Sequence, residues 1–181
     1  MYGLTTEASF DAAHFLTDYY GKCENLHGHR WRVVVTIEQG ELGNAGTGKD
    51  MVLDFGVFKK TVRETVAELD HMFLVEEGSL KPATIACLKE EGFTLKMLPF
   101  RTTAENLARY LCERLAAAGL PVAEVEVDET PNNRAFYRPE LKRPAPTPPD
   151  AACGCSRPPS GSPTSRGRFW ARTPSRTSCR R

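Results

Sequence analysis

Alternation of apolar and polar residues predicts four strands in the first 140 residues. Residues 2–15 alternate loosely, and residues 29–39 (HRWRVVVTIEQ) alternate more regularly and are rich in β-branched side chains. Residues 121–130 (PVAEVEVDET) and 134–139 (RAFYRP) predict two further strands around a Pro-Asn-Asn turn. We therefore expect a sheet whose strands come from both ends of this region.

The middle of this region has helical spacing instead. Residues 54–71 carry apolar side chains three and four positions apart, at Val57, Phe58, Val62, Val66 and Leu69. In residues 102–119, Thr102 and Glu105 match a capping box and Gly119 ends the pattern. Residues 51–56 briefly extend the strand pattern, and residues 76–101 predict a loop with a short helix. The order ββααββ indicates an α+β domain, with an antiparallel sheet and helices on one face.

Composition divides the chain into two parts. Residues 143–181 contain eight arginines, eight prolines and one aspartate, but no Leu, Ile, Val or Met. Their charge is +7, so residues 1–142 carry −6 of the net +1. We therefore expect a domain over residues 1–142 and a disordered Arg/Pro-rich tail that is dispensable for activity. We favour a solvated appendage over a nucleic-acid-binding tail. The Arg/Pro/Ser/Gly-rich composition of the tail also resembles an out-of-frame extension of the gene.

The sequence shows neither a membrane span nor a secretion signal. No apolar run approaches the roughly 20 residues that a transmembrane helix needs. The start, MYGLTTEASF, lacks a basic region followed by an apolar stretch. The six cysteines are irregularly spaced and suggest no disulfide framework. These features predict a cytoplasmic protein with reduced thiols.

Three of the four histidines are predicted to share one metal ion. His27 and His29 are two positions apart at the start of a strand, so both side chains leave the same face. His14 falls opposite them if the first two strands form a hairpin. Three imidazoles would leave a fourth position on Zn²⁺ open for substrate or water, as in catalytic sites. For an isolated His-x-His pair, ordinary core histidines would be the commoner explanation.

Two further groups have competing interpretations. Cys23 precedes the second strand in a polar loop, where Lys22 and a zinc ion would favour its thiolate as a general base. It could instead be a fourth zinc ligand. Asp70 precedes His71 at the expected end of the first helix and could set its tautomer, as in catalytic triads. The alternative is a polar helix end stabilised by the helix dipole.

Several motifs together resemble the 6-pyruvoyltetrahydropterin synthase family over residues 2–138. They are AAHFL, CENLHGH, LDF, LDHMFL, TTAEN and VEVDETPNNRAFYR, in that order. The Cys-x3-His-Gly-His spacing resembles the branch that makes 6-carboxytetrahydropterin for queuosine biosynthesis. The resemblance implies a zinc-dependent lyase acting on 7,8-dihydroneopterin triphosphate, with acetaldehyde and triphosphate as further products. The alternatives are the pyruvoyl-forming synthase and a non-catalytic zinc or pterin-binding module.

The resemblance also implies residue roles, a fold and an assembly. His14, His27 and His29 match the zinc ligands, Cys23 the catalytic thiol, and Asp70 with His71 the proton-relay pair. Glu129 matches the anchor of the pterin ring, and Thr103 and Glu105 match positions near it. The family's tunnelling fold assembles sheets into a barrel of trimers or hexamers, with Asp70 and His71 supplied by a neighbouring subunit. Residues that bind the triphosphate are not identified; Lys22, Arg30 and Arg101 are candidates by charge alone.

Overall fold

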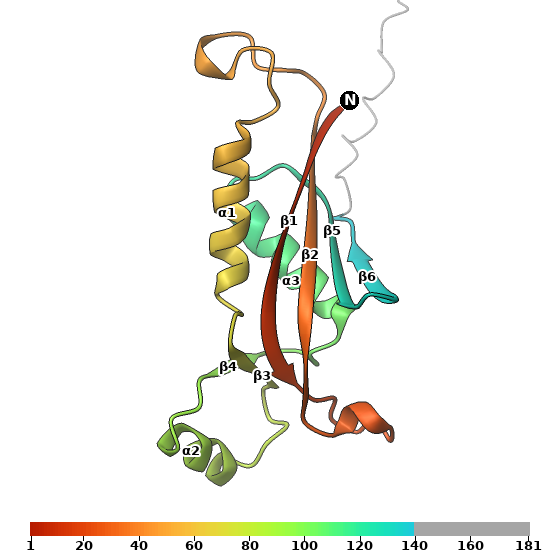
Figure 1. Cartoon of the computed structure of the whole chain (residues 1–181), viewed down its shortest axis with the longest axis vertical. Helices are drawn as coiled ribbons and strands as arrows, with labels where there is room; N and C mark the ends of the chain where they lie inside the picture. Colours follow the sequence, from red (N-terminus) through yellow and green to blue (C-terminus); the bar gives the residue numbers. More distant parts are fainter. Residues whose placement is uncertain (140–181) are drawn as a thin grey trace, which may run out of the picture. The chain divides into compact units, whose positions relative to one another are not determined.

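The computed structural model describes residues 1–139, which form a six-stranded sheet and three α-helices (Figure 1). The sheet order is β4-β3-β1-β2-β5-β6. The strands are β1 (Tyr2–His14), β2 (His27–Gln39), β3 (Met72–Glu76), β4 (Leu95–Leu98), β5 (Val122–Thr130) and β6 (Asn133–Tyr137). The α-helices are α1 (Phe55–Ala67), α2 (Pro82–Glu90) and α3 (Ala104–Ala117), and short 3₁₀ turns lie at η1 (Lys22–Glu24) and η2 (Gly46–Gly48). The predictions for residues 143–181 lie outside the described residues.

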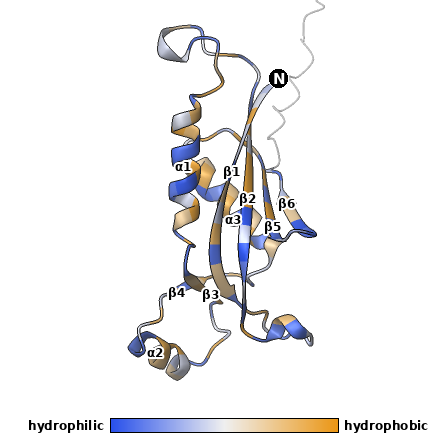
Figure 2. Cartoon of the chain, viewed as in Figure 1, coloured by the Kyte–Doolittle hydropathy of each residue, from blue (hydrophilic) through white to orange (hydrophobic). Residues whose placement is uncertain are grey.

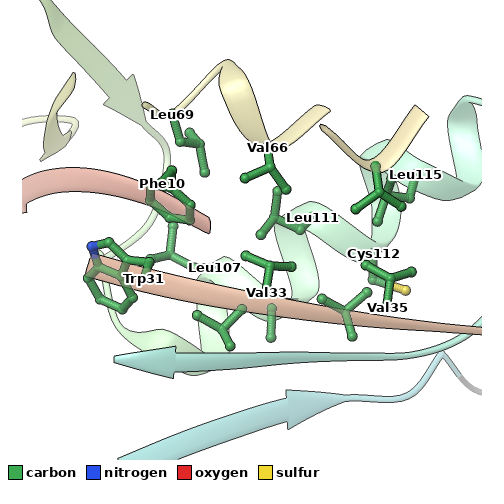
Figure 3. Close-up of a cluster of buried hydrophobic side chains, with 14 of the residues drawn as sticks. Phe10, Trp31, Val33, Val35, Val66, Leu69, Leu107, Leu111, Cys112 and Leu115 are labelled. Atoms are coloured by element: carbon green, nitrogen blue, oxygen red, sulfur yellow. The ribbon is translucent and has the colours of Figure 1, made fainter. Parts of the chain in front are cut away.

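The core lies between one face of the sheet and the helices α1 and α3. Helix α1 packs on β1, α3 packs on β5 and β6, and the two helices contact each other. Figure 3 shows their apolar side chains meeting those of the two central strands, with Phe10 and Trp31 at one end. The prediction of helices on one face of a sheet is therefore confirmed for α1 and α3. The other face of β2 presents charged side chains, including Arg30 and Arg32.

The predicted element order ββααββ was incomplete, because it lacked β3 and β4. These strands have only five and four residues, and β3 pairs in parallel with both β1 and β4. Helix α2 lies within residues 76–101, where a loop with a short helix was predicted. It connects β3 to β4 and so forms a parallel β-α-β unit. The sheet is thus mixed rather than antiparallel. Residues 51–56 form no strand, since Asp54 already caps α1.

The helix ends also differ from the sequence predictions. The N-cap of α3 is Thr103, whose side chain accepts a hydrogen bond from the Asn106 amide, so Thr102 and Glu105 do not form the predicted capping box. Helix α1 ends at Ala67, and residues 69–71 lie in the turn beyond it. His71 is therefore not a helix-end residue. Figure 2 shows hydrophobic residues on α2, although none of its residues is buried.

None of the helices in residues 1–139 has both the length and the apolar character needed to cross a membrane.

Candidate metal centre

Pairing of β1 with β2 brings the three histidines together. The two strands are antiparallel, with His14 opposite His27 and Ala12 opposite His29. The side chains of all three histidines project from the face that also buries Phe10 and Trp31. A Cβ at Gly28 would lie 3.3 Å from the Ala12 carbonyl oxygen, so the glycine between the two histidines allows the backbones of β1 and β2 to approach closely. The sequence prediction that these imidazoles converge is confirmed.

The imidazoles present three nitrogen atoms to one point. One ligand atom of each histidine lies within 4.8 Å of the others. The Nδ1–H of His14 donates to the Thr102 carbonyl oxygen (2.9 Å), and that of His27 donates to the Asn25 carbonyl oxygen (2.7 Å). Because a carbonyl only accepts, these two rings keep a free lone pair on Nε2.

The Nε2 atoms of His14, His27 and His29 are buried, and none has a hydrogen-bond partner among residues 1–139. Buried polar atoms without a partner are rare and costly. A divalent metal ion would satisfy all three at once, so the donor set fits the zinc predicted from the sequence.

The surroundings of the site favour the neutral form of two of its imidazoles, those of His14 and His29. His14 is fully buried, and the Trp31 ring lies 5.0 Å from its ring and 5.3 Å from that of His29. Burial lowers the pKa of His14 to about 4. It also lowers the pKa of His29 below its ordinary 6.5. A neutral imidazole is the form that binds metal, so neither ring needs to lose a proton at neutral pH.

A β-bulge directs Glu129 toward the histidines. In the β5–β6 pairing, Asp128 lies opposite Arg134 and Thr130 lies opposite Asn133, which leaves Glu129 as an extra residue. Its Oε1 is 3.7 Å from His14 Nε2 and 3.8 Å from His29 Nε2. The structure therefore places this carboxylate beside the three imidazoles.

Asp70 and His71 form a hydrogen-bonded pair that is held against β1. The His71 Nδ1–H donates to Asp70 Oδ2 (2.9 Å), while Asp70 Oδ1 accepts the backbone N–H of Asp11 (2.8 Å). The His71 amide donates to the Asp11 carbonyl (2.7 Å). The Asp11 amide and, secondly, His71 hold the pKa of Asp70 below its usual value. His71 adopts φ +57°, a conformation seldom used by non-glycine residues and often found at functional sites.

Two clefts border these groups. One, of about 890 Å³, is lined by His29, Asp70, Glu129 and the arginines Arg30, Arg32 and Arg63, among others. The second, of about 490 Å³, has both His29 and His71 in its wall, next to the exposed ring of Phe93. His29 and the Asp70–His71 pair thus open onto shared space.

The other predicted site residues are placed less centrally. Cys23 is partly exposed in η1 and is not in the group of converging ligand atoms. Its alternative role as a fourth zinc ligand therefore gains no support. Thr103 caps α3, and Glu105 is exposed in the first turn of that helix. Of the three charged triphosphate candidates, only Arg30 lines the larger cleft; Lys22 and Arg101 do not.

Sequence reasoning missed two residues here. Thr102 was interpreted as a helix cap, but its carbonyl accepts the His14 Nδ1 proton across 88 positions of sequence. Arg63 was not considered, although it lines the larger cleft with Arg30. Thr102 carried no local signal for this contact. For Arg63 the one available signal was a basic residue on the polar face of a predicted helix.

Together these features define an α+β protein with a three-histidine site suited to a metal ion. Comparison with known proteins makes the assignment specific. The chain belongs to the 6-pyruvoyl tetrahydropterin synthase family, whose model matches residues 3–140. It is accordingly an enzyme of the lyase class, and the resemblance inferred from the sequence is confirmed.

Relatives in this family carry a more specific name. The chain is 36% identical over 141 residues to the 6-carboxy-5,6,7,8-tetrahydropterin synthase of Haemophilus influenzae, covering 76% of this chain and 99% of that protein. The Aquifex aeolicus protein of the same name is 33% identical over 129 residues, covering 66% and 77%.

Solved structures confirm the tunnelling fold. A Wolinella succinogenes protein described as uncharacterized superposes with a TM-score of 0.63 at 23% identity, covering 77% of this chain and 98% of that one. The 6-pyruvoyl tetrahydropterin synthase of Caenorhabditis elegans gives a TM-score of 0.55 at 26% identity, covering 76% and 95%.

Proposed function

We propose that this enzyme converts 7,8-dihydroneopterin triphosphate and water to 6-carboxy-5,6,7,8-tetrahydropterin, acetaldehyde and triphosphate, as a cytoplasmic step of queuosine biosynthesis. The observation that supports this proposal most directly is the set of three Nε2 atoms without hydrogen-bond partners beside the Glu129 carboxylate. The names of the curated relatives and the Cys-x3-His-Gly-His spacing favour this product over the pyruvoyl compound.

His14, His27 and His29 would hold zinc. When bound there, zinc would supply Lewis acidity that makes neighbouring substrate hydroxyl and C–H groups more acidic. The site's burial supports this assignment, since removal of water strengthens electrostatic interactions. The Nδ1 protons of His14 and His27 are held by carbonyl oxygens, which directs Nε2 of each ring to the metal.

Glu129 would bind the pterin ring. A carboxylate can accept two parallel hydrogen bonds from the exocyclic amine and the adjacent ring N–H. The bulge turns Glu129 out of the regular strand register, and its side chain is only 27% exposed. A partly desolvated carboxylate would hold the ring in one orientation beside the metal. Thr103 and Glu105, at the start of α3, are proposed to lie near the same ring.

Cys23 and the Asp70–His71 pair would move protons. The Cys23 thiolate would remove a proton from the substrate side chain. His71 donates its Nδ1–H to Asp70 in a hydrogen bond, so its unprotonated Nε2 can accept or return a proton in the cleft. Arg30 and Arg63 line the larger cleft and would pair with the triphosphate. For Arg63, no ion pair is found within residues 1–139.

We further propose that the enzyme is a homo-oligomer, a trimer or hexamer. In the described chain, β4 and β6 are the two edges of the sheet. An exposed edge offers unpaired backbone groups, and pairing with another subunit would satisfy them. The 79% exposed side chain of His71 is compatible with a site completed by a neighbouring subunit.

Product identification tests the proposal. The zinc-loaded protein is incubated anaerobically with 7,8-dihydroneopterin triphosphate, and the products are identified by mass, with Cys23→Ala as the control. We expect 6-carboxytetrahydropterin and acetaldehyde from the unchanged protein and neither from the variant. Formation of 6-pyruvoyltetrahydropterin instead would replace the proposed activity with that of the pyruvoyl-forming branch. Absence of turnover by the zinc-loaded protein would reject both.

A further inference from the structure

Thr102 makes two contacts with the most deeply buried histidine of the site. The Thr102 residue is 0% exposed and directly precedes the cap of α3. Its carbonyl oxygen lies 2.9 Å from His14 Nδ1, and its hydroxyl oxygen lies 3.3 Å from the same nitrogen. Backbone and side chain of one residue therefore both face the ring atom opposite the metal-binding nitrogen.

Elementary hydrogen-bond chemistry fixes the direction of these contacts. The carbonyl can only accept, so the proton of His14 is on Nδ1. The Thr102 hydroxyl donates its own proton to the Phe15 carbonyl (3.2 Å), which leaves its lone pairs toward His14. One threonine thus secures the imidazole proton and the backbone that follows β1.

The source of this support distinguishes His14 from His27. His27 finds its Nδ1 partner two residues away, at Asn25, within the same hairpin. His14 depends on a residue 88 positions away, at the start of α3. Correct orientation of His14 therefore requires the α3 segment to be docked on the sheet.

We propose that Thr102 is a positioning residue, which holds His14 in the Nδ1–H tautomer and in the ring orientation that directs Nε2 to the metal. This inference rests on the metal-binding part of the proposed function. Removing such a partner of a metal ligand typically weakens metal affinity by about 10- to 100-fold.

Zinc affinity of the full chain, measured by competition with a chromophoric chelator, tests the side-chain contribution. Thr102→Val keeps the backbone carbonyl and nearly the same volume but removes the hydroxyl. We expect its zinc dissociation constant to rise about tenfold, and that of Thr102→Ser to stay within about threefold of the unchanged protein. Thr6→Val is the matched control. Like Thr102, Thr6 is a buried threonine, but it lies on β1, eight residues from His14. Its affinity should not change.

A second measurement needs no substitution at Thr102. In the metal-free protein, ¹⁵N NMR of the His14 ring should show a protonated Nδ1 and an unprotonated Nε2. The opposite tautomer, or equal zinc affinity in folded Thr102→Val and the unchanged protein, would overturn the inference. Failure of the unchanged protein to bind zinc would instead reject the metal site itself, so the two failures are distinguishable.

Discussion

Replacement of Asp70 by asparagine tests the proton relay at constant side-chain size. Asp70 accepts two hydrogen bonds, from the Asp11 amide at 2.8 Å and from His71 Nδ1–H at 2.9 Å. Both partners are donors, whereas an asparagine offers one oxygen and one NH₂ group. The backbone N–H of Asp11 cannot turn away, so it keeps the oxygen. The NH₂ group then faces His71, which must accept on Nδ1 and carry its proton on Nε2.

In that tautomer, the His71 Nε2 can no longer take a proton from the substrate. A change of this kind in an Asp–His pair costs up to about 10⁴-fold in kcat. His71 adjoins the cleft at a solvent-exposed position, where water can replace part of its function. We therefore expect a fall in kcat of roughly 10²- to 10⁴-fold for Asp70→Asn, with KM and zinc content nearly unchanged.

The assay is steady-state formation of acetaldehyde by the zinc-loaded protein, with zinc measured in the same samples. Asp11→Asn is the matched control, because it removes a nearby carboxylate but keeps the backbone N–H and C=O that hold Asp70 and His71. Its kcat should stay within about threefold of the unchanged protein. If Asp70→Asn keeps more than about a tenth of kcat, or if the control loses as much, the relay reasoning is refuted.

Two further predictions concern stability. Burial lowers the pKa of His14 from 6.5 to about 4, so between these pH values the folded metal-free protein binds fewer protons than the unfolded chain. The free energy of unfolding therefore decreases as the pH falls below 6.5. Urea unfolding in the presence of a chelator should show that the free energy of unfolding is about 2 kcal/mol lower near pH 5 than at neutral pH because of His14. The His14→Leu variant should lack this decrease. Equal decreases in the two proteins would contradict the prediction. Asp54 accepts hydrogen bonds from the Gly56 and Val57 amides, so Asp54→Ala should cost about 1 kcal/mol and Asp54→Asn much less. Equal unfolding midpoints for both Asp54 variants would refute the capping role.

Local sequence patterns were sufficient for the elements that build the histidine site. Strand periodicity placed His27 and His29 on one face, and the assumption of a hairpin placed His14 opposite them. Helical spacing identified α1 and α3, whose apolar residues cover that face. These features are predictable because side-chain direction repeats every two residues in a strand and every 3.6 in a helix.

The short parallel strands were not predictable in the same way. Strands β3 and β4 have too few residues for a clear alternation, and their pairing depends on the α2 connection and on the edge of β1. Parallel pairing joins segments that no tight turn links, so no local turn signal announces it.

What the sequence determined by itself was therefore a set of faces: which side chains leave the same side of each strand or helix. The tertiary structure decided which distant groups meet those faces. A bulge between β5 and β6 turned Glu129 toward the imidazoles, and docking of α3 brought the Thr102 carbonyl to His14. Local periodicity follows from backbone geometry that each short segment carries. Register shifts and contacts over 88 residues depend on packing of the whole core, which no short segment contains.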